Sequence, residues 1–299
     1  MAHYQLPTRP PHLHLLPHLP QCPTLPSSTP STQRTVRIGT RSSALALAQC
    51  HLFATLLTKG NPSLTTAILP THTSLGDTDK STSLHTLASG GKALWTEDLE
   101  AELLNGRVDI LVHSMKDVPT QIAQEFRIAA VGMRDEPRDA VVMSTTRAQE
   151  GKKTLGDLPE GGVVGTSSVR RAAMIRRKYP HLTIQDVRGN IGTRLTKLDT
   201  PSLGFDALVL AGAGVQRLGL ADRISSWLGS PEGMLHAVGQ GALGVEWRAS
   251  DEWVEGLVGG CGRGREGRRV SWECVAERGV LRALEGGVFG SCGGGVWLG

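Results

Sequence analysis

From residue 35 onward, short runs of apolar residues alternate with longer segments in which apolar residues recur every three or four positions. The short runs are typical of buried strands, and the longer spacing is typical of amphipathic helices. The runs predict strands at 36–38, 64–69, 108–112, 140–143, 182–187 and 206–210. Because helical segments separate most of these runs, the pattern predicts an α/β protein.

The first predicted helix begins at Ser43 and ends at Asn61-Pro62, because proline stops a helix. A second helix begins at Thr96 and ends at Asn105-Gly106. The apolar face of the first helix is predicted to consist of Leu45, Ala48, Leu52 and Leu56. Residues 256–299 are rich in glycine, a composition that disfavours a packed domain.

One motif occurs twice, at 36–46 and at 163–174. Each copy has an apolar strand, a Gly-Thr turn, hydroxyl residues with arginine, and then a helix. A helix start offers free N–H groups and a partial positive charge that suit an anion, and arginines strengthen this preference. Two such sites on two α/β units suggest a cleft between two lobes that holds an extended polyanion. An ordinary exposed helix start with solvated arginines is the alternative.

Charged residues follow the apolar run at 108–112. Lys116 and Asp117 lie just past its end, where ligands bind in open α/β sheets. A surface ion pair is the alternative interpretation of these two residues. His113 is interpreted as a packed or hydrogen-bonded residue and not as a base.

Arginines also lie on glycine-containing turns near other predicted strand ends. Several arginines that converge at one sheet edge imply a ligand with several carboxylates. The pair Gly212 and Gly214 is a weak dinucleotide signal, because a third glycine and a distal acid are missing. The arginines in question are Arg170, Arg171, Arg188, Arg194 and Arg217.

Composition narrows the setting. In 299 residues, 39% are apolar and 20% charged, which fits a soluble globular protein. The net charge of +4 is too small to imply nucleic acid, and no apolar run approaches the ~18 residues of a membrane span. The five cysteines form no zinc or disulfide pattern, so a cytoplasmic location is expected. Residues 1–34 are expected to be a disordered Pro- and His-rich tail.

The motifs together resemble the porphobilinogen deaminase (hydroxymethylbilane synthase) family. Their order along the chain, from about 35 to 287, also matches. The motifs are Gly39-Thr40-Arg41-x-Ser43, the run from His113 to Thr120, Gly165-Thr166-Ser167-Ser168-Val169-Arg170-Arg171, Arg188-Gly189-Asn190, Thr193-Arg194-Leu195, the run from Val238 to Gly244, and Ala276-Glu277-Arg278.

The resemblance implies a fold of three domains. The first two would be lobes similar to periplasmic binding proteins, with a cleft between them. Domain 1 would comprise 35–134 and 239–262, and domain 2 would comprise 135–238. Residues 263–299 would be the incomplete start of a third α+β domain, most of which would lie beyond Gly299. The polar segment 71–92 would match the family's mobile cover of the cleft.

The resemblance also implies a function, that of a transferase of tetrapyrrole (heme) biosynthesis. It would join four porphobilinogens into hydroxymethylbilane and release ammonia at each step. The growing chain would be attached to a dipyrromethane cofactor, which a cysteine holds through a thioether. The family likeness implies a cytoplasmic monomer with a small-molecule substrate, no nucleic acid, no membrane and no metal.

Residue roles follow from the same resemblance. Asp117 would be catalytic, accepting hydrogen bonds from pyrrole N–H groups and stabilising the cation that forms as ammonia leaves. Lys116 would bind acidic groups of the cofactor. The other cofactor-binding residues would be Arg41, Ser43, Ser114, Thr166, Ser168, Arg170, Arg171, Arg188, Gly189, Arg194 and Arg217.

The chain departs from the family pattern at the cofactor attachment. The family has Cys-Ser-Val-Pro after Glu-Gly-Gly, but here Gly287 is followed by Val288, and the nearest cysteine is Cys292. Valine has no nucleophile for a thioether. Two hypotheses result: an enzyme chain with an altered end, or a catalytically dead two-lobe protein that binds polycarboxylates. The end could be the family's end read in a shifted frame, because deleting one base from an allowed coding of the residues from 288 onward restores Cys-Ser-Val-Pro.

Overall fold

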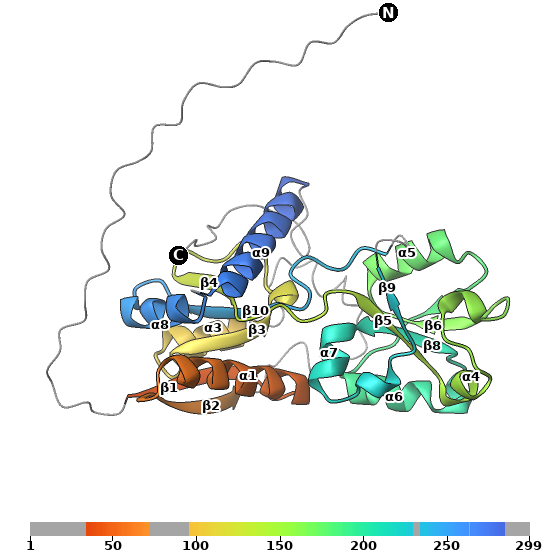
Figure 1. Cartoon of the computed structure of the whole chain (residues 1–299), viewed down its shortest axis with the longest axis horizontal. Helices are drawn as coiled ribbons and strands as arrows, with labels where there is room; N and C mark the ends of the chain where they lie inside the picture. Colours follow the sequence, from red (N-terminus) through yellow and green to blue (C-terminus); the bar gives the residue numbers. More distant parts are fainter. Residues whose placement is uncertain (1–33, 72–95, 230–233, 263, 285–299) are drawn as a thin grey trace, which may run out of the picture. The chain divides into compact units, whose positions relative to one another are not determined.

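The computed structural model describes residues 34–71, 96–229, 234–262 and 264–284. Most of the predicted tail and of the predicted cleft cover lies outside the described residues, as do Val288 and Cys292. Within them, two five-stranded sheets with surrounding helices confirm the α/β class (Figure 1). All six predicted strands are present, with ends shifted by up to three residues.

The first sheet has the strand order β2-β1-β3-β10-β4. β1 is parallel to both β2 and β3, whereas β10 is antiparallel to β3 and β4. Strand β10 lies more than a hundred residues after β4 in the sequence. The bounds are β1 (Thr35–Arg41), β2 (Thr65–Thr71), β3 (Ile110–Ser114), β4 (Phe126–Val131) and β10 (Leu243–Arg248).

Four helices accompany this sheet: α1 (Ala44–Gly60), α3 (Glu97–Leu104), α8 (Glu252–Gly262) and α9 (Arg265–Ala283). The predicted apolar face of α1 is wrong. Leu52 is 45% exposed, whereas Phe53 is fully buried and packs in one cluster with Ile38 and Trp247. The large aromatic ring at 53 fills the core and turns the helix about its axis. The buried residues of α1 are Gln49, Cys50, Phe53, Ala54 and Leu57.

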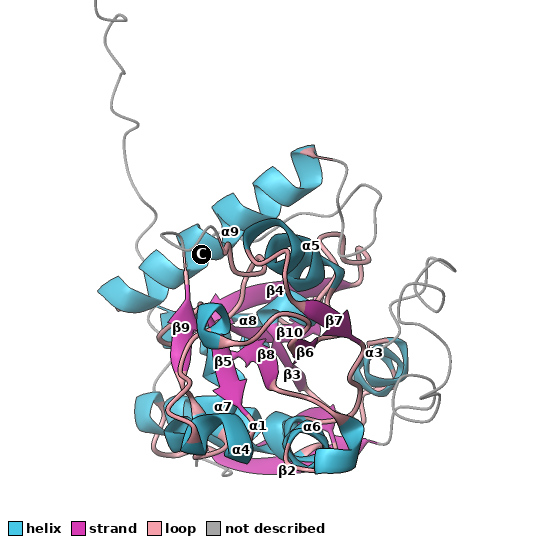
Figure 2. Ribbon diagram, turned by 90° about the vertical axis from the view of Figure 1, so that its right-hand side faces the viewer, coloured by secondary structure: helices cyan, strands magenta, loops and turns pink. Residues whose placement is uncertain are grey.

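The second sheet has the order β7-β6-β8-β5-β9 (Figure 2). β6 is parallel to β7 and β8, and β5 is antiparallel to β8 and β9. Val141 and Val142, neighbours in β5, belong to separate apolar clusters, so both faces of this sheet are covered. The bounds are β5 (Asp139–Met143), β6 (Val163–Gly165), β7 (Thr183–Gln185), β8 (Ala207–Ala211), β9 (Ser226–Leu228), α4 (Thr145–Gln149), α5 (Val169–Lys178), α6 (Ile191–Leu198) and α7 (Gly212–Arg217).

The pair Gly212 and Gly214 has a packing role. A Cβ atom on Gly212 would overlap the ring of Trp227, and one on Gly214 would lie 2.9 Å from Cδ1 of Ile191. These glycines let α7 approach its neighbours closely, which accounts for the pattern without a dinucleotide.

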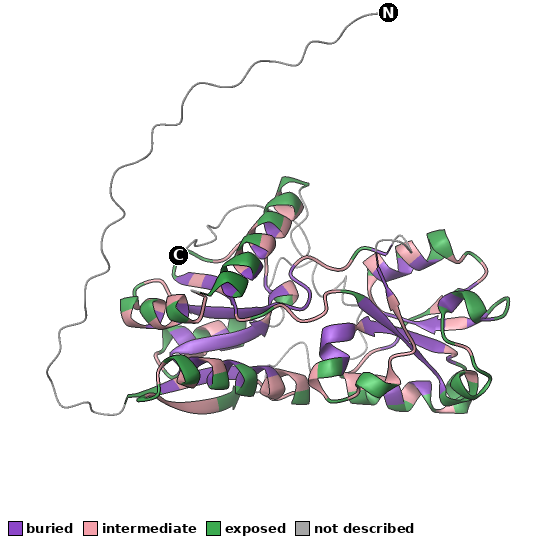
Figure 3. Cartoon of the chain, in the orientation of Figure 1, coloured by how far each residue is buried: buried purple, intermediate pink, exposed green. Residues whose placement is uncertain are grey.

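The glycine-rich region from 256 to 284 is helical and packed, contrary to the expectation from its composition. Val254 and Val258 of α8 join the first core, and Val270 and Cys274 of α9 pack with Met115. A Cβ on the glycines at 256, 260 and 279 would meet nothing within 4 Å, so they lie on open sides of the helices. Helix α9 lies beside β4, with one side buried and the other exposed (Figure 3). The division into three domains stays a prediction.

Candidate active site

The turn after β3 carries the two residues of greatest chemical interest. It is a single 3-10 turn, Met115–Asp117, held by the Met115 N–H, which donates to the carbonyl of Ala242 at 3.1 Å. Met115 is buried and anchors the turn in the core, whereas Asp117 is exposed. The Lys116 Nζ donates to Oε1 of Gln240 at 3.2 Å.

The ammonium of Lys116 is electrostatically coupled to groups on both sheets. Burial, with smaller contributions from the positive charges of Arg171 and Arg170, lowers the pKa of Lys116 to about 8, against the opposing effects of Asp117 and Asp139. A lysine in this state exchanges its proton close to neutral pH. The structure therefore brings Lys116 and Asp117 together with the arginine pair, as the two-lobe interpretation requires.

The arginine pair lies at the start of α5 and has a protein counter-ion. Ser168 is the N-cap and accepts from the Arg171 N–H at 3.4 Å. Thr166 Oγ1 accepts from the Ser168 N–H at 3.2 Å. Arg170 and Arg171 each donate from Nη2 to one oxygen of Asp139, at 2.8 Å. The pair is thus not a set of solvated arginines at an open helix start.

Asp139 is 1% exposed, and burial on its own would raise its pKa. Arg171 and Arg170 outweigh this effect, so the pKa of Asp139 falls below the usual range. The carboxylate is therefore ionised at neutral pH. Its one negative charge is shared between two guanidinium groups, which leaves the group cationic as a whole.

Arg194 extends the cationic group from α6. Its Nε donates to the carbonyl of Gly189 at 2.6 Å. Burial lowers the pKa of Arg194, Arg171 lowers it further, and Asp117 acts in the opposite direction. Gly189 has φ of 112°, and a Cβ there would lie 2.9 Å from Thr193 Cγ2, so the turn needs glycine. Arg188 also lowers the pKa of Arg194, and its carbonyl accepts from Lys197 Nζ at 3.1 Å.

Three predicted residues lie at the carboxyl ends of β1 and β3. Arg41 is the last residue of β1, and Ser43 caps α1 by accepting from the Ala46 N–H at 3.3 Å. Ser114 ends β3 and accepts from Gln49 Nε2 at 2.8 Å. Because β1 and β3 are parallel, these ends share one edge of the first sheet.

Arg217 is bonded to residues other than Lys116, Gln240 and Asp139. Its Nε pairs with Asp135 at 2.7 Å, and its Nη2 donates to the carbonyl of Gly241 at 2.7 Å. These contacts join α7 to the segments that connect the two sheets. His113 is buried with its Nε2 2.9 Å from Oε2 of Glu246, which confirms that it is a packed, hydrogen-bonded residue.

Sequence reasoning missed two members of the site, Asp139 and Gln240. Gln240 is 1% exposed and donates from Nε2 to Asp139 Oδ1 at 2.8 Å. The signals were present: an acid opens the otherwise apolar strand β5, and a glutamine stands between Gly239 and Gly241. Their partners are distant in sequence, so the contacts could not be foreseen.

None of the described helices has the length and apolar character needed to cross a membrane. The described part of the chain contains no cluster of three or more His, Cys, Asp or Glu side chains arranged to hold a metal ion.

Comparison with known proteins identifies the family. Residues 36–256 match the family described as porphobilinogen deaminase, dipyromethane cofactor binding domain. The chain is 46% identical over 259 residues to the porphobilinogen deaminase of Neurospora crassa, covering 85% of this chain and 74% of that protein. It is 44% identical over 256 residues to the protein of that name from Synechococcus sp., covering 86% and 77%.

Among solved structures, a probable amino-acid ABC transporter extracellular-binding protein from Bacillus subtilis aligns with a TM-score of 0.43 at 13% identity, covering 84% of this chain and 96% of that one. This likeness is too slight to carry an argument. The family assignment rests on the sequence relatives and on the family match. The matched region, 36–256, contains nearly all of both sheets and every described residue of the cationic group. The chain belongs to the porphobilinogen deaminase family.

Proposed function

We propose that this chain uses the Lys116–Asp117 turn and its arginines to bind acidic pyrroles and to join them. The reaction is that of the family, a transferase of tetrapyrrole biosynthesis that polymerises four porphobilinogens into hydroxymethylbilane and releases ammonia. One observation carries the assignment to this site. The exposed carboxylate of Asp117 lies within electrostatic range of Lys116 and of Arg194, the cations of two different sheets.

The binding role rests on an excess of positive charge. The five cations outnumber the three carboxylates among these groups, so acidic side chains of a pyrrole are favoured. The cations are Lys116, Arg170, Arg171, Arg188 and Arg194, and the carboxylates are Asp117, Asp139 and Asp186. Each guanidinium has five N–H donors, and Asp139 takes one from each arginine of the pair. The remaining proposed binding residues are Arg41, Ser43, Ser114, Thr166, Ser168, Arg188, Gly189 and Arg217.

Asp117 is the proposed catalytic residue. As the bond from the aminomethyl carbon to nitrogen breaks and ammonia departs, positive charge develops on the pyrrole ring. A fixed carboxylate stabilises this charge and accepts a hydrogen bond from the ring N–H. The same carboxylate can take up the proton that the receiving ring loses when the new carbon–carbon bond forms.

The cationic group fits the acidic side chains of dipyrromethane, which when bound supplies the first ring to be extended. The covalent attachment does not fit, since Val288 offers no sulfur. The three described cysteines do not replace it. Burial raises the pKa of Cys50, Cys261 and Cys274 to about 11, so each stays a thiol at neutral pH. At Val288 and at the three described cysteines, the group would therefore be held by charge and not by a thioether.

Cytoplasmic location and a monomeric state are part of the proposal. The three described cysteines are free thiols, which suits a reducing compartment. The non-catalytic binding protein is not favoured by any comparison.

Ammonia release tests the proposal directly. The purified chain is incubated with porphobilinogen, ammonia is quantified over time, and intact mass is measured before and after. We expect saturable binding of porphobilinogen, and release of ammonia at a rate that rises when dipyrromethane is added. Absence of both binding and ammonia release would refute the proposal, and binding alone would support the non-catalytic alternative.

A further inference from the structure

The backbone conformation around Gln240 is constrained by its neighbours, independently of the contacts that its side chain makes. Gly239 and Gly241 have φ of 70° and 88°, conformations that L side chains rarely adopt. A Cβ on Gly239 would lie 2.8 Å from Met115 Cγ, and one on Gly241 would overlap the carbonyl of Asp135. In addition, the carbonyl of Gln240 accepts from Arg134 Nε at 2.9 Å.

The side-chain amide of Gln240 has one arrangement that satisfies its neighbours. Its Nε2 donates to two acceptors, the carbonyl of Pro137 at 2.7 Å and Oδ1 of Asp139 at 2.8 Å. Its Oε1 accepts from Lys116 Nζ, which is only a donor when charged. Exchanging O and N would place oxygen against two oxygens and nitrogen against the ammonium, so the orientation is determined by the contacts.

We propose that Gln240 is a positioning residue of the site, whose amide holds the Lys116 ammonium on one side and the Asp139 carboxylate on the other. Because Asp139 also holds Arg170 and Arg171, the lysine of the first sheet and the arginines of the second are joined into one set of cations. A neutral amide suits this place: it separates Lys116 from Asp139, so the carboxylate stays with the arginines. The role within catalysis rests on the proposed function, but the contact itself does not.

The test is the reactivity of Lys116 toward acetic anhydride, which acylates only the neutral amine. The whole chain is labelled between pH 6 and 11 and digested, and the acylated fraction of Lys116 is compared with that of the exposed Lys59 by mass spectrometry. In the unaltered chain half-maximal labelling is expected near pH 8. Burial and the charges of Arg171 and Arg170 disfavour the Lys116 ammonium, whereas the carboxylates of Asp117 and Asp139 favour it. No pyrrole and no turnover are needed, so failure of the proposed function would leave this result unaffected.

Two variants must shift the labelling in opposite directions. Gln240→Met removes the acceptor from the ammonium and lowers the pKa of Lys116 by about one pH unit. Gln240→Glu keeps the shape but replaces the Nε2 donor with an oxygen that faces the Pro137 carbonyl and Asp139. Once this carboxyl is ionised, it adds a negative charge beside Lys116, which raises the pKa of Lys116 by about one pH unit or more. The control is Gln149→Met, the same change at an exposed glutamine of α4, which should leave the pH of half-labelling unchanged.

Two outcomes would overturn the proposal. A general loosening of the site would hydrate Lys116 and raise its pKa toward 10.5 in both variants. An unchanged labelling profile in both, with circular dichroism equal to that of the parent, would show that the contact does not act on Lys116. If Gln240→Met fails to fold, the Glu variant decides alone, because its added charge acts on Lys116 even if the contacts to Pro137 and Asp139 are lost.

Discussion

Arg278 of α9 donates from Nη1 to the carbonyl oxygen of Val118 at 3.1 Å, one residue beyond the proposed catalytic Asp117. Its Nη2 donates to the next carbonyl, that of Pro119, at 2.5 Å, and Arg282 donates to that of Thr120 at 2.7 Å. Three consecutive carbonyls after the site are therefore held by one helix. Arg278 is 2% exposed, and burial lowers its pKa to about 10.

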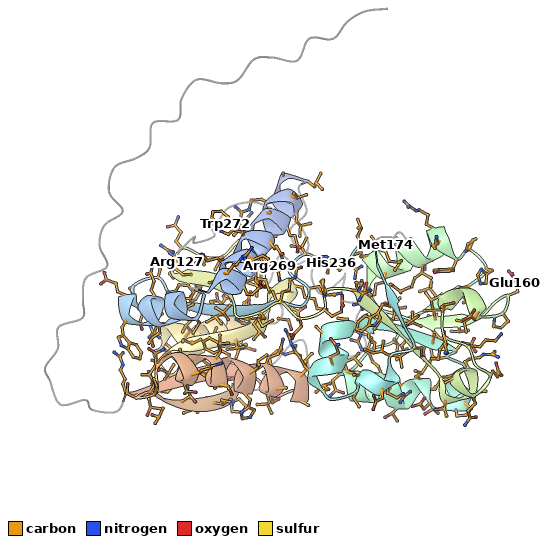
Figure 4. The ribbon with its side chains drawn as sticks, in the orientation of Figure 1. Arg127, Glu160, Met174, His236, Arg269 and Trp272 are labelled. Carbon is orange, nitrogen blue, oxygen red and sulfur yellow. The ribbon has the colours of Figure 1, made fainter. Side chains whose placement is uncertain are left out.

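Arg278→Met should lower the free energy of unfolding by about 3 kcal/mol, because the buried Val118 carbonyl and the partly buried Pro119 carbonyl lose a charged donor. Urea denaturation followed by circular dichroism measures this change. The control is Arg269→Met on the same helix, where Arg269 is exposed and pairs with Glu266 and Glu273 at the surface (Figure 4). Equal effects of the two substitutions would show that the carbonyl contacts contribute nothing.

Asp117→Asn should keep the binding of acidic pyrroles and reduce single-turnover ammonia release about 100-fold or more, because the amide removes the charge and preserves the shape. The measurement is rapid-quench ammonia release in a chain whose frame is restored at 288. Asp222→Asn, at another exposed aspartate, should leave the rate near that of the parent. A rate within a few-fold of the parent in Asp117→Asn would show that another group is catalytic.

Arg171→Gln should weaken porphobilinogen binding about 10-fold to 100-fold, because it removes one charge-assisted contact. Titration calorimetry measures the affinity, at a temperature at which both proteins are folded, since Asp139 also loses a partner. Arg176→Gln, at an exposed position of the same helix, is the control. Unchanged affinity in Arg171→Gln would mean that this arginine serves Asp139 alone.

Lys116 should make the free energy of unfolding depend on pH between about 8 and 10.5. Its pKa is about 8 in the folded chain and 10.5 for an ordinary lysine. The unfolded state therefore binds more protons between these values, so stability rises with pH across that window. Lys116→Met removes this dependence. The melting temperature of the variant should therefore exceed that of the parent by more at pH 7 than at pH 10.5. A constant difference across this range would contradict the prediction.

The end of the chain yields a prediction about its gene. If a one-base frame error lies near the codon of Gly287, transcript sequencing will give Cys-Ser-Val-Pro directly after it. The frame-restored chain should then carry an added mass of two linked pyrroles, and the present chain should lack it. A transcript that encodes Val288 with no alternative frame would reject this explanation.

The sequence alone predicted elements better than faces and contacts. The six predicted strands could be found because each is a short apolar run, and the site turns could be found because they follow strand ends, whereas β4 and β9 were not predicted. The buried face of α1 could not be predicted, because Phe53 packs in the core against Ile38 and Trp247, which are distant in sequence. The counter-ion of the arginine pair was missed for the same reason: Asp139 and Arg171 are brought together only by the second sheet.

Among the described strands, β4 has a single neighbour in its sheet, and that neighbour is β10. Phe126–Val131 thus lacks this partner until the ribosome has made Leu243–Arg248, by which time every described strand of the other sheet has been synthesised. The sheet that begins first in the chain must finish last, and its closure requires contacts of high sequence separation, which form slowly. During synthesis the second sheet can assemble while the first still exposes the edges of β3 and β4, so this interval is when the nascent chain is most open to aggregation.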